Sequence, residues 1–396
     1  MRKVLIASYD MEIGGVERSL INMLSEFDYS NNKVDLMLYS HSGDFFNMLS
    51  DKANLLSENE KYKTFRQSIA QIFKEKLVRI GTGRVLAKVE SNRLKLIGKY
   101  NDIGYVQMQY MWKYTIKYLP ALDSNYDVAI SYLWPHHFVA EKVKAKKKIA
   151  WIHTDYSVIE TDINEDLKIW NKYDNICAVS EECKNSFLKK YPGLMKKVQV
   201  VENITSPKFI ENMSKEEVDD DLRNERGFKL VSVGRFSYAK GIDDGVRALK
   251  ILHERGMTNI KWYVVGYGGE ENIIRELISE YGLENSFILI GKRTNPYPYM
   301  KACDLYVQPS RYEGKAVTVG EAQILGKPVL ITNYSTAKSQ VKQGIDGFIT
   351  EKGPDGIADG VEKLYKDHNL RFELSRFCKK TNFGNTEQLE NLYNLF

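Results

Sequence analysis

The sequence predicts an α/β protein made of two doubly wound, Rossmann-like domains that face each other across a cleft. Short apolar stretches alternate with helical lengths in both halves of the chain, which is typical of parallel sheets. The 396 residues exceed what one core usually holds and fit two domains of about 150 to 200 residues each. The two halves also begin alike, because residues 1–24 and 229–254 each read as a strand, a glycine-containing turn and a helix.

We expect a first domain at 1–204 with a basic insertion near 61–118, a second domain at 205–375, and a C-terminal helix at 376–396 that packs back on the first domain. The boundary follows the last strand of the first half and precedes a connecting segment with an acidic cluster. The expected strands are 1–7, 34–39, 128–132, 148–152, 176–179 and 198–201, then 229–234, 261–265, 287–290, 305–307, 329–331 and 347–349.

Composition favours a soluble globular protein of the cytoplasm. Apolar residues make up 43% of the chain and charged residues 28%, which is close to the average of folded domains. The four cysteines lack metal-ligand spacing, so we expect them to be reduced. No run approaches the roughly 18 apolar residues of a membrane span, and the N-terminus reads as a strand and not as a secretory signal.

The net charge of +5 is unevenly distributed, because residues 61–99 hold eleven Lys and Arg against two Glu. Apolar residues recur there at helical spacing, at Ile69, Ile72, Phe73, Leu77 and Ile80. This pattern predicts an amphipathic helix with a basic polar face. Such a face suits an anionic membrane surface, but it also suits a helix packed on its own domain with solvated lysines. Nucleic acid is not expected, because no recognition motif accompanies the charge.

The most informative feature is a pair of acids, Glu313 and Glu321, that follows a buried strand. The pattern predicts a turn after the strand and then a short helix, with Glu313 at the strand end and Glu321 inside the helix. Between the acids, a helix N-terminus can present the backbone N–H groups of Gly314, Lys315, Ala316 and Val317. Acids beside N–H donors at the carboxyl edge of a parallel sheet suit a sugar nucleotide. Two glutamates on a solvated helix are the alternative.

Further candidates follow other strands of the second half. Arg235 and Lys240 flank a strand-to-helix turn, where two cations can neutralise a pyrophosphate and its departing charge. Gly266 and Gly268 permit close backbone approach to a nucleoside or phosphate, although a tight structural turn uses the same residues. Arg293 ends another strand in a segment that can offer backbone groups to a base.

Two candidates lie in the first half. Gly15, in a Gly-Gly pair at a helix start, leaves room for a ligand, although such a pair is usually a turn. His153 ends an expected strand and therefore points toward the cleft between the domains; a hydrogen-bonded strand-end histidine is the alternative. No Ser-His-Asp order, zinc-ligand spacing or P-loop is present.

Together these stretches resemble the retaining glycosyltransferases of family 4, which have the two-domain GT-B fold. The matching motifs are GGVER at 14–18, VSE at 179–181, VGR at 233–235, KG at 240–241, GYG at 266–268, PSRYEG at 309–314, EA at 321–322, GKPV at 326–329 and GIDG at 344–347. The resemblance is dense from about 229 to 349 and thinner before it. Two positions depart from the family pattern, because Ala316 stands where Gly or Pro is usual and Lys315 where an aromatic or apolar residue is common.

The resemblance implies a role for each matching residue. Arg235 and Lys240 would hold the donor pyrophosphate, Glu313 would face the donor sugar, and Glu321 would bind the ribose hydroxyls. The amides of 314–317 would line the sugar and phosphate. From the first domain, Gly15 would meet the phosphate and His153 would lie by the sugar. Family members need no metal and no cofactor, and they keep the anomeric configuration.

The resulting expectation is a glycosyltransferase that moves a hexose or N-acetylhexosamine from a nucleotide donor, UDP-linked by preference, to a saccharide acceptor. Capsular, exopolysaccharide or other surface-glycan synthesis would supply that acceptor, in polyprenyl-linked form, at the inner face of the cell membrane. The alternatives are a GT-B sugar-nucleotide epimerase or phosphorylase, or a catalytically silent partner subunit of the same fold.

Overall fold

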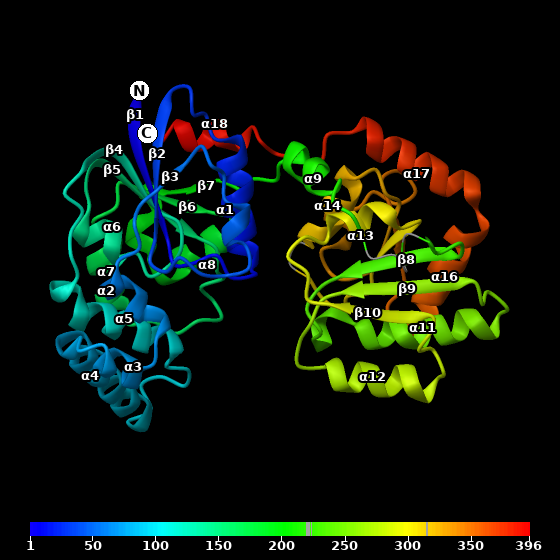
Figure 1. Cartoon of the computed structure of the whole chain (residues 1–396), viewed down its shortest axis with the longest axis horizontal. Helices are drawn as coiled ribbons and strands as arrows, with labels where there is room; N and C mark the ends of the chain where they lie inside the picture. Colours follow the sequence, from blue (N-terminus) through cyan, green and yellow to red (C-terminus); the bar gives the residue numbers. More distant parts are fainter. Residues whose placement is uncertain (219–221, 223, 314–315) are drawn as a thin grey trace. The chain divides into compact units, whose positions relative to one another are not determined.

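The computed structural model describes residues 1–218, 222, 224–313 and 316–396. The chain forms two compact units; in Figure 1 the first is coloured from blue to green and includes the red C-terminal segment, and the second is coloured from green to red. Unit 1 comprises Met1–Thr205 and Asn385–Phe396, and unit 2 comprises Ser206–Gly384. Each unit is built on one parallel sheet.

Unit 1 contains a seven-stranded sheet with the order β3-β2-β1-β4-β5-β6-β7. All the strand pairs are parallel. The strands are β1 (Arg2–Ser8), β2 (Asn32–Leu38), β3 (Asn54–Leu55), β4 (Asn125–Ser131), β5 (Lys144–Ile152), β6 (Asn175–Ala178) and β7 (Val198–Val200). Their side chains are buried toward the carboxyl ends, which is why these segments read as apolar runs. The short edge strand β3 was not expected from the sequence.

The helices of unit 1 lie between these strands in the chain, except α18, which follows unit 2. They are α1 (Gly15–Glu26), α2 (Glu60–Lys63), α3 (Ile69–Lys74), α4 (Val78–Leu96), α5 (Gly104–Thr115), α6 (His137–Lys142), α7 (Ile163–Trp170), α8 (Glu181–Lys190) and α18 (Gln388–Tyr393). Several begin at a capping side chain; Asp162, for example, accepts hydrogen bonds from the first amides of α7 at 3.1 and 3.3 Å.

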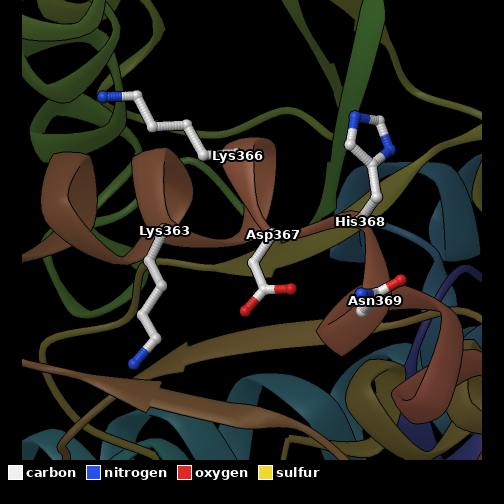
Figure 2. A pocket seen from close by; sticks show the side chains of 5 residues that line it. All are labelled: Lys363, Lys366, Asp367, His368 and Asn369. Carbon is white, nitrogen blue, oxygen red and sulfur yellow. The ribbon is translucent and has the colours of Figure 1, made fainter.

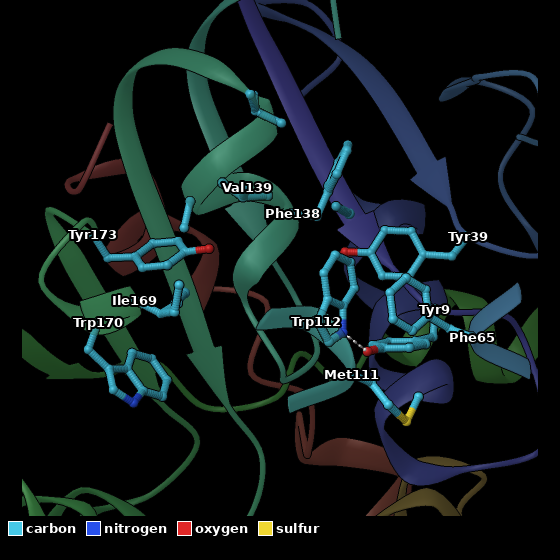
Figure 3. Close-up of a cluster of buried hydrophobic side chains, with 14 of the residues drawn as sticks. Tyr9, Tyr39, Phe65, Met111, Trp112, Phe138, Val139, Ile169, Trp170 and Tyr173 are labelled. Atoms are coloured by element: carbon cyan, nitrogen blue, oxygen red, sulfur yellow. Dashed lines mark hydrogen bonds between the residues drawn. The ribbon is translucent and has the colours of Figure 1, made fainter. Parts of the chain in front are cut away.

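An aromatic cluster joins the 61–118 segment to the sheet of unit 1 (Figure 3). Trp112 stacks on Phe65 with ring centroids 4.1 Å apart, and its indole N–H donates to the hydroxyl of Tyr9 at 2.7 Å. Tyr39, which directly follows β2, contacts the rings of both Tyr9 and Trp112. The segment is therefore an integral part of the unit 1 core and not a loose insertion.

The basic stretch expected as one amphipathic helix is two helices, α3 and α4, which are joined by a short turn and are called the α3–α4 hairpin below. The break has a local cause, because Lys76 adopts a left-handed conformation with φ of 60°. The amide of Leu77 then donates to the carbonyl of Ile72 at 3.1 Å, which closes a helix C-terminus. The expected single stripe of apolar residues is thus divided between two helices.

Unit 2 contains a six-stranded parallel sheet with the order β10-β9-β8-β11-β12-β13. The strands are β8 (Phe228–Val233), β9 (Ile260–Val265), β10 (Phe287–Gly291), β11 (Leu305–Gln308), β12 (Val329–Thr332) and β13 (Phe348–Thr350). The helices are α9 (Pro207–Met213), α11 (Ile242–Glu254), α12 (Glu271–Glu280), α13 (Tyr297–Ala302), α14 (Val317–Ile324), α15 (Ala337–Gln340), α16 (Gly353–Lys366) and α17 (His368–Lys380). Figure 1 shows α11 and α12 on one side of this sheet and α9, α13 and α14 on the other, so that a hydrophobic core fills each face.

The C-terminal segment returns to unit 1. Tyr393 of α18 accepts a hydrogen bond from the amide of Asp28 at 2.8 Å, and its ring meets Phe27 edge-on. The division between the units follows Thr205, and the returning segment begins at Asn385. The expected start at 376 lies inside α17, whose buried Leu374 and Cys378 belong to unit 2.

Among the described helices, none is both long enough and apolar enough to cross a bilayer.

Candidate functional site

The loops that follow β8 and β11 pack tightly against each other, because these strands are neighbours in the sheet of unit 2. The amide of Arg311 donates to the carbonyl of Ala239 at 2.8 Å. Gly241 has φ of 61°, and a side chain there would place its Cβ 2.2 Å from the carbonyl oxygen of Pro309. Only glycine allows this approach, which joins the two loops at the carboxyl edge of the sheet.

Glu313 and Lys240, which come from these two loops, form an ion pair with Nζ and Oε1 2.5 Å apart. The same carboxylate oxygen accepts from the hydroxyl of Ser310 at 2.7 Å and from the side-chain amide of Gln308 at 3.2 Å. The Glu313 side chain is 10% exposed and that of Lys240 is 25% exposed. A carboxylate with three donors on one oxygen is fixed in place while the group still reaches solvent.

A second layer of hydrogen bonds orients the donor amide of Gln308. Its side-chain oxygen accepts from the hydroxyls of Tyr306 and Thr318 at 2.8 and 3.1 Å. The amide nitrogen is therefore turned toward Ser310 and Glu313. The sequence analysis missed Gln308 and Ser310; the available signal was a polar residue at the end of an otherwise apolar, buried strand.

Arg311 fastens the start of α11 to the β11 loop. Its guanidinium contacts Asp243 and Asp244 at 2.7 to 2.8 Å and donates to the carbonyl of Tyr238 at 2.9 Å. It also lies 4.4 Å from the centroid of the Tyr238 ring. The hydrogen bond to Asp243 raises the pKa of Arg311 further above its usual value. Arg311 therefore holds Lys240 in place through the neighbouring backbone.

Arg235, the other predicted phosphate ligand, is exposed just beyond β8. Its loop contacts the loop after β9, where glycine is required twice. A Cβ on Gly266 would lie 1.9 Å from the carbonyl oxygen of Gly234, and one on Gly268 would lie 2.4 Å from that of Phe236. These glycines thus have the structural role that the sequence analysis left open, and they place the two loops side by side at the sheet edge.

At the start of α14, one of the expected backbone N–H donors already has a hydrogen-bond partner. The amide of Ala316 donates to the side-chain oxygen of Gln340 at 3.2 Å, and Gln340 donates back to the Ala316 carbonyl. Val317 begins the helix and is half exposed. Gly314 and Lys315, also predicted for this site, lie outside the described residues.

The side chains of Glu321 and Arg293 each form a hydrogen bond with a tyrosine of α13. Glu321 is 1% exposed and accepts a hydrogen bond from the hydroxyl of Tyr297 at 2.9 Å. Arg293 is exposed after β10 and donates to the hydroxyl of Tyr299 at 3.0 Å. The two aromatic partners come from the same short helix, which sequence reasoning did not connect with the site.

Gly15 and His153 belong to unit 1. Gly15 is the first residue of α1, and a Cβ there would meet no atom within 4 Å, so the space above it is open. His153 directly follows β5 and lies against the Tyr132 ring with centroids 4.7 Å apart. Burial lowers the pKa of His153 to about 3, which keeps its imidazole neutral at physiological pH.

A hollow on the surface of unit 2 lies away from these residues. It has a volume of about 500 Å³ and is formed where α16 ends and α17 begins, with the lining residues Lys363, Lys366, Asp367, His368 and Asn369 (Figure 2). None of the residues predicted for the site lines it. Within the described parts of the chain, no His, Cys, Asp and Glu side chains group closely enough to hold a metal ion.

The chain is similar in sequence and in fold to known glycosyltransferases. Residues 213–381 match the family model of glycosyl transferases group 1. Capsular polysaccharide biosynthesis glycosyltransferase CapM of Staphylococcus aureus is 31% identical over 56% of this chain and 62% of its own length. An Escherichia coli UDP-Gal:alpha-D-GlcNAc-diphosphoundecaprenol alpha-1,3-galactosyltransferase is 24% identical over 52% of this chain and 54% of its own length. The solved structure of HepE from Anabaena, in complex with UDP and glucose, covers all of both chains at 16% identity with a TM-score of 0.66.

Residues 213–381 are therefore similar to the group 1 glycosyl transferases, and the chain has the fold of GT-B glycosyltransferases. Its alignments span about six tenths or less of the length of CapM and of the galactosyltransferase. The expected two parallel, doubly wound sheets are confirmed.

Proposed function

We propose that the protein is a retaining glycosyltransferase that transfers a hexose or N-acetylhexosamine from a UDP-linked donor to a saccharide acceptor. The observation that carries this proposal is the Lys240–Glu313 pair with its Ser310 and Gln308 donors, at the carboxyl edge of the unit 2 sheet. A fixed carboxylate beside a cation matches a ligand that has sugar hydroxyls next to a diphosphate. The UDP bound by HepE supports the choice of nucleotide.

In this proposal the cations act on the leaving group. Arg235 and Lys240 neutralise the charge that develops on the diphosphate as its bond to the anomeric carbon breaks. The acceptor hydroxyl attacks the same face of the sugar, and its proton leaves with the departing phosphate oxygen. Glu313 faces the sugar and steadies the positive charge of the ring. Because Lys240 is bonded to Glu313, one cation positions both the phosphate and the carboxylate. No metal and no cofactor are required.

The remaining predicted residues complete the proposed donor site. Glu321 would bind the ribose after its Tyr297 partner moves aside, and Arg293 would lie toward the base. For the residues of unit 1, Gly15 stays a proposed phosphate contact, with open space above it, and His153 a proposed neutral hydrogen-bonding group for the sugar, because burial holds its pKa near 3.

For the acceptor we propose a polyprenyl-linked saccharide of surface-glycan synthesis, met at the inner face of the cell membrane. CapM is named for capsular polysaccharide biosynthesis, and the E. coli relative acts on a sugar linked to diphosphoundecaprenol. Both names support an acceptor of this class.

The proposal is tested by release of UDP from a panel of UDP-sugars in the presence of undecaprenyl-diphosphate-linked N-acetylglucosamine. Glu313→Gln keeps the shape of the side chain, and we expect it to lower turnover at least a hundredfold. Glu284→Gln, an exposed glutamate of the same unit, is the matched control and should retain activity. Near-normal turnover in Glu313→Gln would overturn the catalytic assignment.

Calorimetry with UDP separates binding from turnover. Arg235→Ala should weaken UDP binding about tenfold, whereas Arg275→Ala on α12 should leave it unchanged. Donor turnover without an acceptor would instead identify an epimerase, and dependence on inorganic phosphate would identify a phosphorylase. UDP binding with no turnover of any donor would identify a silent subunit.

A further inference from the structure

The outer face of α4 carries a row of exposed apolar side chains. Val78, Val85, Val89 and Leu96 are 38 to 87% exposed. Their spacings of seven, four and seven residues place them within about 40° of one another around the helix. They lie in one line along the helix, which we call the α4 ridge. Leu86 lies beside the ridge and is also exposed.

The α4 ridge has no part in holding the helix to unit 1. The opposite face does so, through the buried residues Ile80, Ala87 and Leu94. Two glycines bring the neighbouring helices close, because a Cβ on Gly81 would touch the Phe73 ring and one on Gly83 would touch Thr115. The helix therefore has two apolar faces, of which only one is buried. A solvent-facing apolar row of this length indicates a partner surface.

Cations border the α4 ridge on both sides. Lys88 and Lys95 flank it on one side, and Arg79 and Arg93 on the other, by their positions around the helix. Lys74 at the end of α3 and Lys76 in the turn before α4 add two more exposed charges. The acids of the hairpin are already engaged. Glu75 accepts from Gln67 and Gln71, and Glu90 lies 3.6 Å from Arg93.

We propose that the α3–α4 hairpin is a membrane-docking surface, on which the α4 ridge enters the headgroup region of an anionic bilayer and the bordering cations contact lipid phosphates. Charge complementarity selects this partner, since a second copy of the chain would bring the same cations against themselves. The inference deepens the proposed function, because it rests on an acceptor that is held in a membrane. The docking surface lies in unit 1, whereas Glu313 and Lys240 lie in unit 2.

This surface differs from the one expected from the sequence. From the sequence, a basic polar face suits an anionic membrane surface, and a helix packed on its own domain by the apolar stripe, with solvated lysines, is the alternative. Ile72 and Ile80 of that stripe are indeed buried. The exposed valines lie on the other side of α4, so lipid binding requires apolar insertion as well as charge.

Sedimentation with vesicles of phosphatidylglycerol and phosphatidylcholine tests both contributions. Val85→Ser/Val89→Ser should weaken partitioning onto anionic vesicles more than tenfold. Lys88→Glu/Lys95→Glu should weaken it at least fivefold for each charge, with no effect on the weak binding to neutral vesicles. The matched controls on unit 2, Ile273→Ser/Phe372→Ser and Lys208→Glu/Lys380→Glu, should bind like the parent protein.

Insertion is measured directly with an environment-sensitive dye on Val89→Cys in a Cys183→Ser background, since the other three cysteines are buried. The emission should shift to the blue when anionic vesicles are added. The same dye on Ile273→Cys should not shift. Absence of a shift at position 89, or wild-type partitioning of the serine variant, would overturn the proposal.

Further measurements separate membrane docking from a contact between copies of the chain and from a failure of the proposed reaction. If sedimentation equilibrium reveals a dimer that Val85→Ser/Val89→Ser dissociates, then the ridge is a contact between copies and the proposal is overturned. UDP binding by calorimetry should be unchanged in every hairpin variant. Vesicle binding that persists in Glu313→Gln would uphold the docking surface even where the proposed transfer reaction fails.

Discussion

The strength of the Lys240–Glu313 pair can be estimated from its geometry and measured by a double-mutant cycle. The charged atoms are 2.5 Å apart and both side chains are largely buried. Lys240→Met would leave the Glu313 carboxylate with Ser310 and Gln308 as its remaining donors. We expect this to destabilise unit 2 by about 2 kcal/mol, less than the 3 to 5 kcal/mol of a fully buried pair because water still reaches both groups.

Replacing the other partner of the pair, Glu313, should destabilise unit 2 by less. Glu313→Gln keeps an oxygen near Ser310 and leaves a lysine that can turn toward solvent, so we expect a loss of about 1 kcal/mol. Lys240→Met/Glu313→Gln should lose only about 1 to 2 kcal/mol, because neither charge is left alone. The coupling energy of the pair would then be about 1 to 2 kcal/mol.

The assay must report on unit 2 alone, because two units need not unfold together. Hydrogen exchange in increasing urea, followed by mass spectrometry of peptides from β11 and α14, provides that readout. Peptides from β4 of unit 1, measured in the same experiment, serve as an internal control, and their hydrogen exchange should not change. Coupling below about 0.5 kcal/mol would refute the reasoning, since it would mean that solvent screens the pair completely.

Three further changes can be checked with the same method. Gly266→Ala should destabilise unit 2 by about 2 to 4 kcal/mol, because the new methyl overlaps a backbone carbonyl, whereas Gly269→Ala, with open space around it, should be neutral. Arg311→Ala should cost about 1 to 3 kcal/mol, because Asp243 and Asp244 at the start of α11 would lose their shortest ion pairs and be left with Arg247 as a cationic partner, and Arg311→Lys should recover only part of this loss. Burial lowers the pKa of His137 to about 3, so the unfolded chain binds more protons between pH 6.5 and 3, and the stability of unit 1 should fall as the pH falls through that window. At pH 5 this loss is about 2 kcal/mol, and His137→Gln should remove it from the difference between pH 7.5 and pH 5; an unchanged difference would exclude His137 as its source.

Most strands could be predicted from the sequence because both faces of a parallel sheet are covered. Segments such as β9 and β12 are therefore largely apolar, and their expected and observed bounds differ by one residue. The edge strand β3 was missed, since two residues carry no periodic signal. The break at Lys76 was also missed, because a lysine rarely adopts a left-handed conformation and nothing in its neighbours required one.

The candidate site was predictable only in its outline. Parallel strands end at one edge, so the loops that carry Arg235, Lys240 and Glu313 could be assigned to the same region. Their partners depend on side-chain packing that no local pattern contains. Gln308 is oriented by a tyrosine two residues earlier and a threonine ten residues later. The assigned roles of the site residues stay predictions.

The two-segment construction of unit 1 has a consequence for synthesis. Its sheet is encoded before unit 2, but α18, which contacts Phe27 and Asp28, is encoded after it. During synthesis on the ribosome, the surface of unit 1 that α18 covers therefore stays exposed until unit 2 has been synthesised. We expect a chaperone of nascent chains to bind unit 1 at this exposed surface.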